Sequence, residues 1–143
     1  MGTTIIKNGA DMPFEQSKIH IGLTQQTFLS PEEADLVNIS AHGVLMERLF
    51  FRGAVKPHTH DCAEIICLTK GRVNLYHNGV WEEHSAGDVF IVGAGEVHSV
   101  INLNPDEDSE QISFFIPTCD GVKNTPFSAF PAEIADFEER RNS

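Results

Sequence analysis

Short runs of alternating hydrophobic and polar residues dominate the chain and predict β-strands. Lys18–Phe28 alternates through Ile19, Ile21 and Leu23. Val44–Arg52 is mostly apolar on both faces, which is typical of a strand that is covered on both sides. Further strands are predicted at residues 63–69, 72–77, 80–84, 89–92, 98–104 and 111–117. Many short strands and no long helix indicate an all-β sandwich or barrel.

Turn and helix signals punctuate this pattern. Asn78-Gly79, between two alternating runs, is the strongest hairpin signal in the chain. Ser30 followed by Pro31 predicts a capped helical turn near 31–37. The segment A-E-I-A-D-F-E-E-R-R predicts a short C-terminal helix with Ile134 and Phe137 on one face. Residues 1–17 are polar, which indicates an N-terminal arm.

Length and charge narrow the classes of function. The 143 residues suit one domain. A formal net charge of -11 argues against nucleic acid and anionic membrane surfaces as partners. No apolar run approaches the roughly 20 residues of a membrane span, and the N-terminus has no apolar signal region. Three cysteines form no paired framework, so we expect a cytoplasmic location.

The candidate chemistry lies between Gly53 and Gly71. His58, His60 and Glu64 share a parity, so an extended chain can present them on one side. Two imidazoles and one carboxylate suit a divalent transition metal such as iron, manganese, nickel or zinc. The alternative is that the histidines lie on loops without a metal and that Glu64 is a solvated strand residue.

A second stretch, 87–102, offers a fourth donor in His98, and the two stretches together resemble the two motifs of the cupin superfamily. The first motif is matched by Gly53, His58, His60, Glu64 and Gly71, although only four residues separate Gly53 from His58, where five are usual. The second motif is matched by Gly87, Gly95, His98 and Asn102, with Gly93 where proline is usual. The resemblance covers roughly residues 44–117.

The resemblance implies an all-β double-stranded β-helix, or jelly roll, in which His58, His60, Glu64 and His98 hold the metal. It implies a single cupin domain over 1–143, with a motif-bearing core at 44–117 and an extension with a short helix at 118–143. Members of this kind commonly form homodimers. The other histidines, His20, His42, His77 and His84, show no matching spacing and are interpreted as surface or supporting residues.

Strand parity predicts the lining of a pocket around the metal. Its candidates are Met46, Arg48, Phe50, Cys62, Ile66, Leu68, Val100, Asn102 and Phe114. For each apolar member the alternative is plain core packing. Arg48 is also the candidate catalytic residue, because a guanidinium on a buried strand needs either a carboxylate partner or an anionic ligand.

Three functions fit a metal in such a pocket. We weakly favour a dioxygenase acting on a small chelating or anionic substrate, because three histidines and one glutamate accommodate iron readily. A non-redox isomerase, lyase or cyclase is the alternative, and it requires a base in the pocket. A non-catalytic binding or sensor protein is the third hypothesis. The ligand set alone does not separate them, because one fold supports many reactions.

Overall fold

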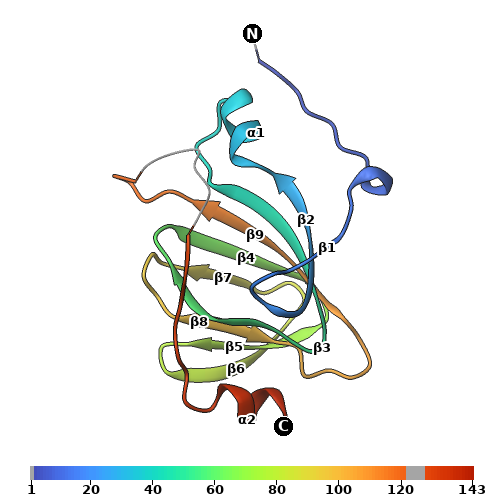
Figure 1. Cartoon of the computed structure of the whole chain (residues 1–143), viewed down its shortest axis with the longest axis vertical. Helices are drawn as coiled ribbons and strands as arrows, with labels where there is room; N and C mark the ends of the chain where they lie inside the picture. Colours follow the sequence, from blue (N-terminus) through green and yellow to red (C-terminus); the bar gives the residue numbers. More distant parts are fainter. Residues whose placement is uncertain (1, 122–127) are drawn as a thin grey trace.

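The computed structural model describes residues 2–121 and 128–143, and one strand, β3, connects most of its sheet (Figure 1). The strands are β1 (Glu15–Gln16), β2 (Ile21–Leu29), β3 (Gly43–His60), β4 (Ala63–Lys70), β5 (Arg72–His77), β6 (Val80–Ser85), β7 (Val89–Val92), β8 (His98–Ile101), β9 (Ser109–Ile116) and β10 (Ala129–Pro131). The helices are a 3-10 turn at Gly9–Asp11, α1 (Pro31–Leu36) and α2 (Phe137–Arg141). The main path through the sheet is β6-β5-β8-β3-β9-β4-β7, with antiparallel pairing throughout.

Strand β3 changes partners halfway along its length. Its first half pairs with β2 and β9, and its second half pairs with β8 and β10. Between the halves the chain bends at residues 50–53, where Arg52 adopts a φ of 62° and Gly53 packs against the backbone of Gly22. A Cβ on Gly53 would lie 2.3 Å from Gly22 O, so only glycine fits there. The bend folds the sheet over on itself into a jelly roll.

The interior of the roll holds one main apolar cluster. It consists of Leu23, Leu49, Val55, Ile66, Leu68, Val73, Leu75, Phe90 and Val100. A second cluster lies outside the roll, where Phe137 of α2 packs against Ala54 and Ile101. The short C-terminal helix therefore covers the back of the β3–β8 pair, at the bottom of Figure 1.

The local signals in the sequence are mostly confirmed, with differences in extent. Ser30 caps α1 through a capping box with Glu33, and Asn78-Gly79 joins β5 to β6. The predicted C-terminal helix is shorter than its pattern, because only residues 137–141 are helical. The short strands β1 and β10 have no alternating pattern long enough to detect. Residues 122–127 of the predicted C-terminal extension lie outside the described part of the chain.

Candidate metal centre

Two segments far apart in sequence bring four buried donors together inside the roll. His58 and His60 end β3, Glu64 lies on β4, and His98 begins β8; each is at most 5% exposed. His58 Nε2 lies 2.8 Å from His60 Nε2. Glu64 Oε1 lies 3.2 Å from His60 Nε2 and 3.1 Å from His98 Nε2. The four donor atoms that the sequence predicted thus converge on one point.

A bulge in β3 aims the two histidines at this point. The register between β3 and β8 shifts between Val55, opposite Val100, and His58, opposite His98. Because of this extra residue, Val55 and His58 both face the interior although they are three positions apart. Residues 61–62 form a bend between β3 and β4 and separate His60 from Glu64. His58, His60 and Glu64 therefore do not lie on one continuous extended strand, as their shared parity had suggested.

The backbone fixes the orientation of all three imidazoles. The Nδ1 atoms of His58, His60 and His98 lie against the carbonyl oxygens of Lys56, Ser128 and Glu96, respectively. A carbonyl oxygen can only accept, so each Nδ1 carries the hydrogen and each Nε2 turns a lone pair inward. Facing lone pairs at 2.8 Å repel each other unless a cation lies beside them. This donor set therefore fits a divalent metal.

The electrostatics of the metal-free site favour a neutral His58 and an ionised Glu64, whereas burial of the His60 ring is outweighed by the adjacent Glu64 carboxylate, which raises the pKa of His60. Burial, together with the neighbouring His98, lowers the pKa of His58 to about 3, so its ring is neutral. Burial opposes the ionisation of Glu64, but the close contacts of its carboxylate with the His60 and His98 rings outweigh burial and hold the pKa of this carboxyl well below its usual range. Neutral imidazoles and an ionised carboxylate are the forms that bind metals.

A fifth residue, Glu47, shares the cavity with these donors and was missed in the sequence. A cavity of about 260 Å³ is lined by Glu47 together with His58, His60 and Glu64. Glu47 is 4% exposed, and its Oε1 accepts hydrogen bonds from Ser113 Oγ at 2.8 Å and Gln111 Nε2 at 3.3 Å. Burial, and then the charge of Glu64, raises its pKa to about 7. The signal was present: Glu47 is an acid between Leu45 and Leu49 on an apolar strand face.

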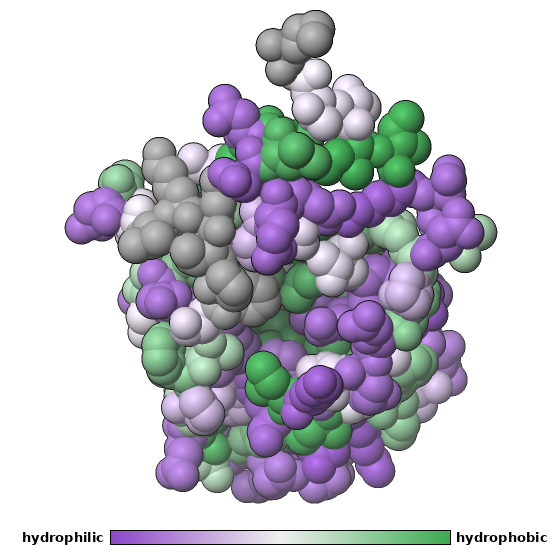
Figure 2. All heavy atoms as spheres, turned by 45° about the horizontal axis from the view of Figure 1, so that its top comes forward, coloured by the Kyte–Doolittle hydropathy of each residue, from purple (hydrophilic) through white to green (hydrophobic). Residues whose placement is uncertain are grey.

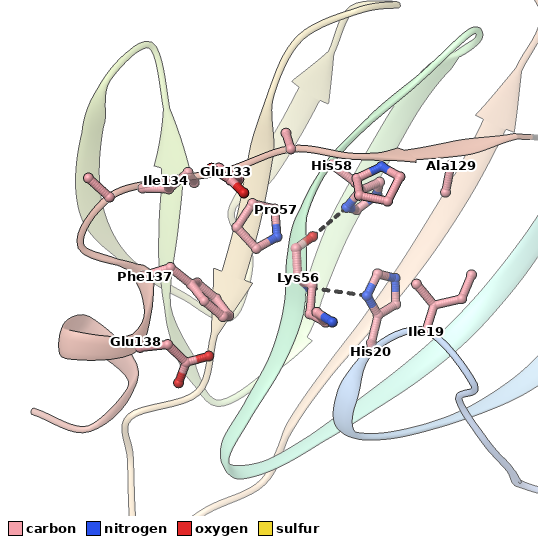
Figure 3. A pocket seen from close by; sticks show the side chains of 13 residues that line it. Ile19, His20, Lys56, Pro57, His58, Ala129, Glu133, Ile134, Phe137 and Glu138 are labelled. Atoms are coloured by element: carbon pink, nitrogen blue, oxygen red, sulfur yellow. Dashed lines mark hydrogen bonds between the residues drawn. The ribbon is translucent and has the colours of Figure 1, made fainter.

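His20 closes the site on the side of β2. Its ring lies 5.2 Å from that of His58, centroid to centroid, and its Nδ1 accepts the Lys56 backbone N–H at 3.0 Å. Figure 3 shows both rings bordering a second hollow of about 600 Å³, which α2 and the segment before it enclose on the other side. His20 thus supports the segment that carries His58. Burial lowers its pKa to about 4, so its ring is also neutral.

The predicted pocket lining is wrong for strand β3. The face that looks into the cavity carries Leu45 and Glu47, whereas Met46, Arg48 and Phe50 lie on the opposite face. Arg48 instead pairs with Glu110, with Nη2 3.0 Å from Oε1, and its guanidinium lies over the Phe14 ring. Of the two alternatives for Arg48, a carboxylate partner or an anionic ligand, the structure thus has the carboxylate partner. Arg48 is therefore no longer a candidate catalytic residue. Both faces of the strand are apolar, so parity could not tell them apart.

The remaining predicted lining residues divide between core and surface. Ile66, Leu68 and Val100 belong to the main core cluster, and Cys62 packs with Leu45 and Phe115. Phe114 points outward at 37% exposure, and its neighbour Phe115 lines the cavity instead. Asn102 is fully buried away from the donors, where its amide donates to Leu49 O and Glu107 O and ties down a turn.

Figure 2 shows one face of the molecule, on which hydrophilic and hydrophobic side chains are interspersed. Within the described residues, no helix is long and apolar enough to cross a membrane.

Comparison with known proteins relates the chain to one family. Residues 52–112, which carry all four donors, match the family model described as Cupin domain. The polyketide cyclase RemF from Streptomyces resistomycificus superposes with a TM-score of 0.72 at 14% identity, over 94% of this chain and 89% of that one. A predicted oxalate decarboxylase from Thermotoga maritima superposes with a TM-score of 0.68 at 23% identity, over 80% and 100%.

A third structure, KdgF from a Halomonas species, superposes with a TM-score of 0.65 at 18% identity, over 82% of this chain and 97% of that one. At these identities the likeness shows a shared fold and no shared activity. A comparison with curated proteins found no match.

Proposed function

From the match of residues 52–112 to the family model described as Cupin domain, we propose that the chain is a metal-dependent cupin enzyme. It catalyses proton transfer to or from a small, chelating or anionic organic substrate, as an isomerase, lyase or cyclase does. The observation that carries the proposal is the buried Glu47 carboxyl in the same cavity as three of the four donors, His58, His60 and Glu64. A base in the pocket is what distinguishes this class from an oxygen-using enzyme. The presence of Glu47 therefore reverses the preference for a dioxygenase that was drawn from the sequence.

The four donors would hold the metal with open positions for substrate. Four protein ligands on a six-coordinate ion leave two positions, which suits a bidentate oxygen chelate. When bound, the ion would act as a Lewis acid toward an oxygen of the substrate. Three neutral imidazoles and one carboxylate around a divalent ion leave a local charge near +1, so an anionic substrate can bind within an acidic protein.

Glu47 is placed to exchange a proton with a substrate in the cavity. Both of its hydrogen bonds end on Oε1, and no residue that the structure describes donates to Oε2. Ser113 and Gln111 thus fix the carboxyl plane while Oε2 stays available to substrate. In the metal-free protein, burial and the charge of Glu64 raise the pKa of Glu47 to about 7, so the group can take up and release protons at neutral pH. The volume of about 260 Å³ restricts the substrate to a small molecule.

The names of two proteins that share the fold agree with this class. One is a polyketide cyclase and another a predicted oxalate decarboxylase. A dioxygenase remains the second candidate, because the donor set of three histidines and one glutamate also accommodates iron.

The test uses protein loaded with manganese, nickel or zinc under argon, in D₂O, with a panel of small 2-oxo and 2-hydroxy acids and 1,3-dicarbonyl compounds. We expect solvent deuterium at a carbon beside a carbonyl of at least one compound. Glu47→Gln should reduce this exchange at least about a hundredfold while metal content stays unchanged. Glu110→Gln, which removes a carboxylate outside the cavity, should exchange like wild type.

Other outcomes of this experiment contradict the proposal. Oxygen consumption by the iron-loaded protein, with no exchange under argon, would favour the dioxygenase. Tight binding of a compound without exchange or turnover would favour a sensor protein. Equal exchange by wild type and Glu47→Gln would remove Glu47 from the chemistry.

A further inference from the structure

A second group of possible metal ligands lies on the β5–β6 hairpin and shares no residue with the four donors. It consists of His77, Glu82 and His84, whose ligand atoms all lie within 4.8 Å of one another. The Glu82 Oε2 atom is 3.0 Å from His77 Nε2 and 3.3 Å from His84 Nε2. Ligands bound at about 2.0–2.1 Å to a tetrahedral zinc ion lie roughly 3.3–3.4 Å apart, so the spacing needs little adjustment.

The hairpin register places these three side chains on one face. Glu82 lies opposite Leu75 and His84 opposite Val73, while His77 is two residues beyond Leu75. Side chains two apart on a strand share a face, so all three project to the side on which Leu75 and Val73 are buried. Asn78 and Gly79, with φ values of 50° and 85°, form a tight turn that fixes this register.

His84 is oriented as a metal-binding histidine is. Its Nδ1 lies 3.0 Å from Asp88 Oδ2, and the same oxygen accepts the Ser85 backbone N–H. A carboxylate that accepts the Nδ1 hydrogen directs the Nε2 lone pair outward from the ring toward a metal. The ring also packs edge-on against Phe90, with centroids 4.9 Å apart. Its tautomer and its direction are therefore both fixed.

The Nε2 atom of His84 lacks the partner that its burial demands. It is shielded from solvent and makes no hydrogen bond with any residue that the structure describes. Its 3.3 Å contact with Glu82 Oε2 is not aligned for one. A nitrogen lone pair facing a carboxylate oxygen is unfavourable, and a cation between the two atoms would relieve it.

The hairpin group also has access to water. A cavity of about 270 Å³ is bordered by His77, Glu82 and His84 and, on its other side, by His98. Water in this cavity can complete the coordination of a metal that has three protein ligands. His77 is compatible with the same role, because the side-chain amide of Asn78 lies 3.3 Å from its Nδ1 and can turn its oxygen toward it.

We propose that His77, Glu82 and His84 form a second divalent metal site that prefers zinc, with Asp88 as the residue that positions His84. Two imidazoles and one carboxylate with an open position suit zinc. The site is more exposed than the four-donor centre, so it binds more weakly. The alternative to a metal site is that the same histidines are protonated and form hydrogen bonds with the carboxylates.

The test is a calorimetric titration of chelator-treated, full-length protein with Zn²⁺ at neutral pH. Wild type should bind two equivalents. Glu82→Gln and His84→Gln should each bind one. Glu83→Gln is the matched control, because it makes the same change on the opposite face of β6, and it should bind two. Asp88→Asn should still bind two, with the weaker site about 10–100-fold weaker.

The result that overturns the proposal is equal zinc binding by Glu82→Gln, His84→Gln and Glu83→Gln, with circular dichroism showing all three folded. The titration also separates this site from the four-donor centre. His98→Ala should lose the tighter equivalent and keep the hairpin one. If His98→Ala binds like wild type while Glu82→Gln loses an equivalent, the hairpin site stands and the four-donor centre fails.

Discussion

At the scale of single residues, Glu47 is an acid that is buried on an inner strand face. The buried polar residues Gln111 and Ser113 on the adjacent strand β9 donate hydrogen bonds to it. Polar side chains at inward positions of a core strand lower the stability of the fold unless they form hydrogen bonds. The polar residues on the inner face of β9 are therefore the hydrogen-bond donors that stabilise the buried Glu47 carboxyl.

The raised pKa of Glu47 predicts how stability depends on pH. The folded protein keeps this carboxyl protonated up to about pH 7, whereas the unfolded chain ionises it near 4.5. Between these values the folded state binds more protons, so the free energy of unfolding falls as pH rises. Urea unfolding of metal-free Glu47→Gln should therefore show a gain over wild type that grows between pH 5 and 8, by about 3 kcal/mol in all. A constant difference between the two proteins would contradict the raised pKa.

At the scale of elements, the bend in β3 sets the geometry of the centre. The strand passes from the β9 side to the β8 side at Gly53, and the bulge that follows turns His58 inward. The glycine is needed because a Cβ at this position would lie 2.3 Å from the carbonyl oxygen of Gly22 and 2.8 Å from that of Phe50.

Gly53→Ala should consequently destabilise the fold by about 1–3 kcal/mol, because backbone atoms on both sides must shift. Gly93→Ala is the matched control, since only the Glu96 Cγ atom lies near its Cβ position, at 3.7 Å. It should unfold within about 0.5 kcal/mol of wild type. Equal urea midpoints for the two variants would show that the close approach at Gly53 does not exist.

At the scale of the whole molecule, one outer sheet face carries a row of apolar side chains that the described residues leave partly exposed. Ile91, Ile65 and Phe114 are direct neighbours across β7, β4 and β9, and Val44 continues the row onto β3. Ile91 is 77% exposed and Phe114 is 37% exposed. A contiguous apolar row on an outer face that ends at an edge strand favours association with a second copy.

We therefore expect a homodimer that uses this face, measured by light scattering after size-exclusion chromatography. Wild type should elute at twice the 15.8 kDa of one chain. Ile91→Lys should shift it to the monomer, whereas Val80→Lys, an exposed apolar position on the β5–β6 hairpin, should not. A monomeric wild type at all concentrations would contradict the expectation.

The sequence predicted the parts of the molecule that depend on local spacing. The Asn78-Gly79 hairpin and the four donors followed from neighbouring residues and two motifs. The inner face of β3 did not, because both faces are apolar and the bulge changes parity after Val55. Glu47 was missed, and His77 and His84 were interpreted as surface or supporting residues, because their partners lie on other strands and only the register brings them together.

The central claim is that His58, His60, Glu64 and His98 bind one divalent metal. Anomalous X-ray scattering from crystals grown with excess manganese or zinc tests it directly. The account predicts a peak about 2.0–2.2 Å from all three Nε2 atoms and from a Glu64 oxygen, with at least one position open to the cavity. The absence of a peak there, with the imidazoles turned apart, would contradict it.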